Sequence, residues 1–118
     1  MKTTVIFFIF IIFSLSACKK DTDSHIESVN NISACGVNDP LNQLKWLNQK
    51  ITTGQNTATS DFVESVWIKK FDGEDIIVIK FGLTSSMYST FNCSGKTINI
   101  QNQDFFNSLS EDLLIYKY

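Results

Sequence analysis

Near its start, the chain carries nine consecutive apolar residues, Val5–Phe13, behind a single positive charge at Lys2. A charged start, a short apolar run and small residues after it are typical of a secretion signal. A helix that crosses a bilayer needs about 20 apolar residues, and this run ends at Ser14. We therefore expect residues 1–17 to be a signal peptide, which would leave 101 of the 118 residues to fold.

The next residues, Leu15, Ser16, Ala17 and Cys18, resemble the bacterial lipobox, in which a leucine and two small residues precede a cysteine. The resemblance implies that a signal peptidase recognises Leu15, Ser16 and Ala17, and that the Cys18 sulfur receives a diacylglycerol. Two or three acyl chains hold a protein on a membrane, whereas one binds only marginally. An ordinary secreted protein with an incidental cysteine is the alternative interpretation.

The segment behind Cys18 is polar, with isolated apolar residues, and predicts a flexible tether over residues 18–34. Its first residues, Lys19–Asp23, resemble the charged signals that send some Bacteroidetes lipoproteins to the cell surface. We expect a lipid-anchored protein of the outer membrane. Both the periplasmic side and the cell surface remain open as its location.

Two cysteines remain once Cys18 is acylated, Cys35 and Cys93. An even pair in an exported protein predicts a disulfide. It would close a loop of 58 residues, which corresponds to about 4 kcal/mol of stability in the chain-entropy model. That is a large share for a domain of this size. Two free thiols are the alternative.

A helix is predicted after Asp39, a suitable N-cap residue, with Pro40 at its first position. Apolar residues recur on one face of it at spacings of three and four. They are Leu41, Leu44, Leu47 and Ile51. Trp46 lies off this stripe and is expected to pack against a neighbouring element. Residues 52–54 should end the helix.

Strands are predicted next, rich in β-branched and aromatic residues. They span residues 62–71, 75–83, 87–93 and 96–101. Asp72-Gly73 predicts a hairpin turn, and Ile76–Ile79, apolar at every position, predicts a central strand. A short helix over 104–110, capped near Asn102, and a last strand or packed tail over 113–118 complete the chain.

These elements make residues 35–118 one small α+β domain of two layers. We expect one amphipathic N-terminal helix packed on a four-stranded antiparallel meander, with a short C-terminal helix and/or strand. Turns are expected at Ser94-Gly95 and around residues 84–86.

Two segments of this domain are similar to a pattern in small lipoproteins of the Bacteroidetes. The first is Cys35-Gly36-Val37-Asn38-Asp39-Pro40-Leu41 with Leu44, Trp46 and Leu47, and the second is Asn92-Cys93-Ser94-Gly95. The resemblance covers residues 35–100. It implies an architecture and an envelope location but brings no activity.

The sequence contains few residues of the types that usually act in catalysis or bind metals. The single histidine, His25, lies in the predicted tether, where no general base would be held in place. Cys35, Cys93 and His25 do not supply a zinc site, and a solvated hairpin turn explains Asp72, Glu74 and Asp75 better than a calcium loop does. We predict no catalytic residue, metal or cofactor.

The charge and the aromatic residues limit the possible partners. After cleavage the chain would hold nine lysines, no arginine and twelve acidic residues, which argues against nucleic acid. Five aromatic residues are candidates for one face of the sheet, where they would either bind sugars and peptides or pack a core. They are Trp67, Phe71, Phe81, Tyr88 and Phe91.

These observations favour a non-enzymatic envelope protein that is attached to the membrane through its lipid and binds a partner protein or a glycan through its sheet. The alternative is a small hydrolase-like or inhibitor protein that uses surface carboxylates such as Asp61 and Glu64. A concave pocket with two converging carboxylates would favour the alternative.

Overall fold

The computed structural model describes residues 25–55, 61–82 and 88–118. The predicted signal peptide and Cys18, the predicted lipidation residue, therefore lie outside the described residues. The helical elements are α1 (Pro40–Gln43), α2 (Lys45–Gln55), α3 (Gln103–Asn107) and the short 3₁₀ helix η1 (Glu111–Leu113). The strands are β1 (Val63–Phe71), β2 (Glu74–Phe81), β3 (Tyr88–Phe91) and β4 (Leu114–Lys117).

A tight hairpin joins β1 to β2, as the sequence predicts. Phe71 pairs with Glu74, so the loop is only Asp72-Gly73. Both loop residues have positive φ angles, 51° and 78°. This is the geometry of a type I′ turn, whose twist matches that of the two strands. An aspartate followed by a glycine is a preferred pair for it because both residue types tolerate a left-handed backbone.

The strand β2 is buried on both faces. All four residues of Ile76–Ile79 are at most 2% exposed, which confirms the central strand expected from its sequence. Ile77 and Ile79 pack under α2 with Leu47 and Ile51, whereas Ile76 and Val78 pack on the opposite face. Alternation along the strand therefore builds two separate apolar clusters.

The strand order is β3-β2-β1-β4, so the first three strands form a meander and the fourth does not continue it. The predicted strand over residues 96–101 is wrong. Only Thr97 forms an isolated bridge, with Phe91, and the chain then crosses the sheet so that Leu114–Lys117 pairs with β1. The C-terminal segment is favoured as the fourth strand because three of its four residues are buried.

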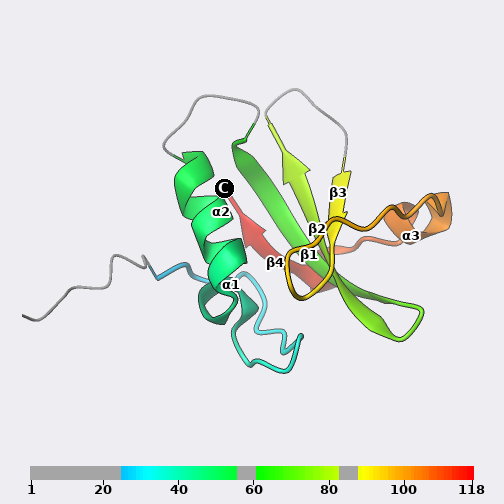
Figure 1. The fold of residues 1–118 in the computed structure, drawn as a ribbon, viewed down its shortest axis with the longest axis horizontal. Coiled ribbons are helices and arrows are strands. Elements are labelled where there is room, and N and C mark those ends of the chain that lie inside the picture. Colours follow the sequence, from blue (N-terminus) through cyan, green and yellow to red (C-terminus); the bar gives the residue numbers. More distant parts are fainter. Residues whose placement is uncertain (1–24, 56–60, 83–87) are drawn as a thin grey trace, which may run out of the picture.

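A third, partial layer covers the sheet face opposite α2 (Figure 1). Phe105 of α3 and Ile100 pack there against Ile76 and Val78. The Asn102 side chain accepts a hydrogen bond from the Asp104 backbone N–H, which confirms the predicted cap. The described fold is mixed α+β, but the sheet has helical segments on both faces instead of the two layers expected.

Two helices replace the single one predicted. Leu44 has an extended backbone (φ −86°, ψ 98°) and separates α1 from α2. Gly54 lies inside α2 and does not end it. The helices are also not N-terminal, because an ordered segment precedes them. Asp39 stands at the start of α1 without a capping bond from its side chain to the helix backbone.

That preceding segment differs from the flexible tether predicted up to residue 34. Ile26 is buried, and its backbone exchanges two 2.8 Å hydrogen bonds with the Asn42 side chain. The Val29 N–H donates to the Ile115 carbonyl, and the Asn30 side chain donates to the Leu114 carbonyl. Residues 26–30 thus cover the outer edge of β4. The lipid would therefore join a shorter linker than the sequence indicated.

The hairpin turn generates a stability test. Replacing Gly73 with valine should lower the free energy of unfolding by about 1–2 kcal/mol, because a β-branched residue resists positive φ. No described atom lies within 4 Å of the added Cβ position, so the cost comes from the backbone. The control, Gly73→Asn, should cost clearly less, as measured by urea unfolding. Equal costs for both variants would contradict the assigned turn.

Candidate ligand-binding groove

A disulfide joins two turns that are far apart in the sequence. The Cys35 and Cys93 sulfurs lie 2.06 Å apart, with a sequence separation of 58, which fits the predicted pairing. Cys35 and Gly36 form the two-residue loop of a small turn, with φ angles of 56° and 73°, closed by hydrogen bonds between Ala34 and Val37. The bond therefore attaches the segment before α1 to the chain just after β3.

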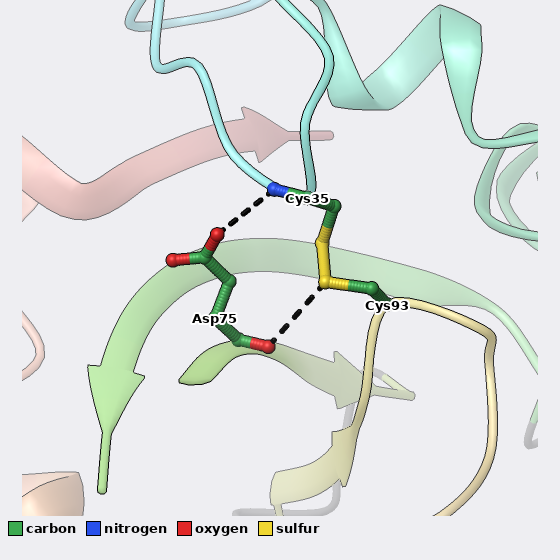
Figure 2. A group of neighbouring side chains, drawn as sticks. All are labelled: Cys35, Asp75 and Cys93. Atoms are coloured by element: carbon green, nitrogen blue, oxygen red, sulfur yellow. Dashed lines mark hydrogen bonds between the residues drawn. A yellow bond between two sulfur atoms is a disulfide. The ribbon is translucent and has the colours of Figure 1, made fainter. Parts of the chain in front are cut away.

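Asp75, at the start of β2, supports this junction (Figure 2). Its carboxylate accepts a 2.9 Å hydrogen bond from the Cys35 N–H and lies 3.3 Å from the Lys70 ammonium. Its carbonyl oxygen lies 3.7 Å from the Cys93 sulfur. Cys35, Asp75 and Cys93 are the one group of potential metal ligands found in the described part of the chain. Sulfurs paired in a disulfide offer no thiolate, however, so we assign no metal here.

The turn after β3 is fixed by a side chain. The Asn92 Oδ1 atom accepts hydrogen bonds from the Ser94 N–H, the Ser94 hydroxyl and the Lys96 N–H. Gly95 closes the three-residue loop with a φ of 84°, the left-handed position of such loops. The predicted Ser94-Gly95 turn is confirmed.

The Trp46 indole fastens α2 to this turn. Its Nε1–H donates a 2.9 Å hydrogen bond to the Cys93 carbonyl, and its ring lies at a tilt against Phe91, with centroids 5.6 Å apart. A Cβ atom on Gly95 would stand only 2.8 Å from the indole. Trp46 therefore packs against a neighbouring element, as its position off the apolar stripe predicts, and only a glycine fits beneath it.

The same helix face continues as one wall of a groove. Trp46, Gln49, Lys50 and Thr53 repeat at spacings of three and four and line this wall. They form a second stripe, beside the buried stripe of Leu47 and Ile51.

Residues from three other segments complete the groove, which has a volume of about 670 Å³. Phe81 comes from the end of β2, Ser94 and Gly95 come from the turn after β3, and Asp61 precedes β1. This volume lies within the usual range for small-molecule sites. The groove is open to solvent along its length, and Gln49, Thr53, Asp61 and Ser94 are exposed.

The ammonium group of Lys50 lies over two aromatic rings. Its ammonium lies 5.2 Å from the centroid of the Phe91 ring and 5.7 Å from that of Phe81. Cation–π contacts at such distances restrict where the charge can move. Among the described residues, the two ion pairs are Lys70–Asp75 and Lys80–Glu64, and neither involves Lys50.

A second close-packed glycine sets the other end of the groove. A Cβ atom on Gly54 would stand 2.4 Å from the Asp61 carbonyl oxygen. The absence of that side chain lets the segment before β1 approach the last turn of α2. Asp61 is thereby brought among the residues that line the groove.

The other candidates from the sequence are dispersed. His25 is exposed, and Asp72 and Glu74 are exposed in a solvated turn while Asp75 faces Cys35. Asp61 lines the groove, but Glu64 is paired with Lys80 at 3.3 Å and does not line it. Leu15, Ser16, Ala17 and Cys18 lie outside the described residues.

The expectation that the five aromatic residues share one face of the sheet is wrong. Side chains alternate along each strand, so these rings are divided between both faces. Phe81 and Phe91 pack on the α2 side. Trp67 and Phe71 pack on the other side, where Tyr88 meets Trp67 edge to face at 5.7 Å. Of the groove residues, Asp61 and Phe81 were candidates from the sequence, whereas Gln49, Lys50, Thr53 and Ser94 were not identified as site residues. The signal for Gln49, Lys50 and Thr53 was their spacing from Trp46.

Comparison of the chain with models of known protein families, with curated proteins and with solved structures finds no significant match. None of the helices within residues 25–55, 61–82 and 88–118 combines the length and the apolar character that a bilayer-spanning helix requires. The chemistry of the groove must therefore be deduced from its own residues.

The contact beneath the indole can be tested with two glycines of similar backbone conformation. Gly95→Ala should lower the free energy of unfolding by at least about 1 kcal/mol more than Gly36→Ala, because only Gly95 is packed against a side chain. Both substitutions carry the backbone strain of a positive φ. Urea unfolding gives the two energies, and the NMR signal of the Trp46 Nε1–H should shift only in Gly95→Ala. Equal destabilisation would contradict the packing.

Proposed function

We propose that this chain is a lipid-anchored protein of the cell envelope that binds a ligand, without covalent chemistry, in the groove beside α2. The observation that carries the proposal is the fixed orientation of Trp46 on the groove wall. The indole is bonded to the Cys93 carbonyl at 2.9 Å and packed on Gly95 before any ligand arrives. Preorganised walls lower the entropy that binding costs.

The N-terminal sequence supports the envelope location. The apolar run Val5–Phe13 and the lipobox-like Leu15–Cys18 are the features expected of a lipoprotein precursor. The two segments that resemble small Bacteroidetes lipoproteins also meet in the fold, because Cys35 bonds to Cys93 and Trp46 packs on Gly95. The residues that carry the resemblance therefore lie in one region of the fold, which supports treating them as one pattern.

The length of the linker between Cys18 and Ile26 limits how far the anchored domain can lie from the membrane. Ile26 is fixed to Asn42 by two hydrogen bonds, so the chain from Cys18 to Ile26 sets the reach of the domain. Eight residues, fully extended, span at most about 28 Å. The groove would therefore work close to the bilayer surface, whether on the periplasmic side or on the outside of the cell.

A hydrolase-like mechanism has less support. Such chemistry needs two carboxylates that converge on one reacting group. Asp61 is the one carboxylate among the described residues that line the groove. A smaller hollow is lined by Glu74 and Asp75, but the Asp75 carboxylate is already held by the Cys35 N–H and Lys70.

The anchor can be tested in cells that are fed a labelled fatty acid. The Cys18→Ala chain should carry no label and should move from the membrane fraction to the soluble fraction, because the proposed attachment atom is gone. The control, Cys93→Ala, should keep its label. Label retained on the Cys18→Ala chain would contradict lipidation at this residue.

The groove can be tested by site-specific photo-cross-linking of the full chain in intact cells. A diazirine-bearing amino acid at Gln49 should give a discrete product, because this side chain is exposed on the groove wall. The matched control is Gln103, an equally exposed helical glutamine on α3. Products that are the same at both positions, or none at Gln49, would contradict ligand binding in the groove.

A further inference from the structure

The groove combines aromatic rings with uncharged polar groups. Trp46 and Phe81 supply ring surface, while Gln49, Thr53 and Ser94 supply an amide and two hydroxyls. Amides and hydroxyls both donate and accept hydrogen bonds. A ligand that matches them must itself carry both kinds of group, together with an apolar face that can lie against a ring. Sugars have this combination, because their C–H faces are apolar and their hydroxyls donate and accept.

The charges on the groove walls argue against an ionic ligand. Lys50 and Asp61 contribute one positive and one negative charge, and no other charged side chain lines the groove in the described residues. A site for a phosphate or a polyanion usually gathers several cations, whereas Lys50 is the one cation among the described residues that line this groove. A single ammonium and a single carboxylate are well suited to charge-assisted hydrogen bonds with neutral hydroxyls.

The architecture also argues against the common modes of peptide binding. An extended peptide usually pairs with an open sheet edge. Here the Ile115 carbonyl at the β4 edge accepts from Val29, and the Thr90 carbonyl at the β3 edge accepts from Ile98. An amphipathic helix needs an apolar groove, whereas the exposed side chains on the described walls of this one are polar, namely Gln49, Thr53, Asp61 and Ser94.

The Trp46 indole is already fixed in position before a ligand binds, which matters most for ligands that bind weakly. Its Nε1–H is already bonded to the Cys93 carbonyl and Gly95 packs beneath the ring, so binding need not order this side chain. The turn that holds it is itself fixed by the Asn92 side chain. Little of the binding free energy is then lost to ordering the site.

We infer that the ligand of this groove is a short uncharged segment of a carbohydrate chain, held by contact with the Trp46 ring and by hydrogen bonds from Gln49, Thr53 and Ser94. This inference rests on the proposed binding function and names the ligand class. The sugar hydroxyls exchange hydrogen bonds with the walls, and no covalent bond forms or breaks. Lys50 supplies a charged hydrogen-bond donor and Asp61 a charged acceptor to the sugar hydroxyls.

The inference is tested by NMR titration of the full Cys18→Ala chain, recovered from the envelope without its lipid. The probes are trisaccharides of glucose, N-acetylglucosamine, mannose and galactose, with trialanine and inorganic phosphate as non-sugar probes. At least one trisaccharide should shift the signals of the Trp46 Nε1–H and the Gln49 amide. The double variant Gln49→Ala/Thr53→Ala should weaken its affinity roughly tenfold, the loss expected for two hydrogen bonds.

The double variant and its control distinguish a loss of binding from a loss of folding. Gln49 and Thr53 are exposed on α2, and alanine favours a helix, so the double variant should keep its fold. Gln103→Ala on α3 is the control and should leave the affinity unchanged. A trisaccharide affinity that is the same in the double variant and in the unsubstituted groove would overturn the inference.

The remaining outcomes separate the ligand class from the proposed function. Shifts of the groove signals by trialanine or phosphate, with none by any trisaccharide, would overturn the carbohydrate inference and leave a binding function in place. Groove signals that no probe shifts would also overturn the carbohydrate inference. The binding function itself is then decided by the cross-link at Gln49.

Discussion

The covalent bond between Cys35 and Cys93 is the constraint on which the rest of this domain depends. It joins a turn before the helices to a turn after β3, and the Trp46 indole then ties α2 to the second turn. Three segments that would otherwise meet only through side-chain packing become one unit. In the chain-entropy model such a bond restricts the unfolded chain more than it strengthens the folded one, so it favours this arrangement without adding bulk to the core.

The central strand of the sheet is buried, and both of its outer strands accept hydrogen bonds from neighbouring segments. The strand β2 is buried on its two faces, and the segments around Val29 and Ile98 take up carbonyls at the two outer strands. Unpaired strand edges invite pairing with other chains. Exposed polar side chains gather instead in the groove between α2 and the turn after β3, where the proposed binding function places the ligand.

Local chemistry explains which features could be predicted from the sequence. Asp72-Gly73 and the Asn102 cap follow from the backbone preferences of a few neighbouring residues. The disulfide was expected because two cysteines remain once Cys18 is set aside as the predicted lipidation residue. Non-local choices were missed. The fourth strand is decided by which segment buries most side chains against β1, and the groove depends on Gly95 meeting Trp46 across the fold. Periodicity within one segment carries no information about such contacts.

The two close-packed glycines have a consequence for how this protein can diverge. Gly54 and Gly95 define the two ends of the groove by the side chains they lack, so substitutions there would alter the fold before they altered recognition. Gln49 and Thr53, in contrast, are exposed on the groove wall and can be exchanged at little structural cost. Under the proposed binding function, substitutions on the exposed face of α2 would change which ligand is bound while the two glycines keep the shape of the groove.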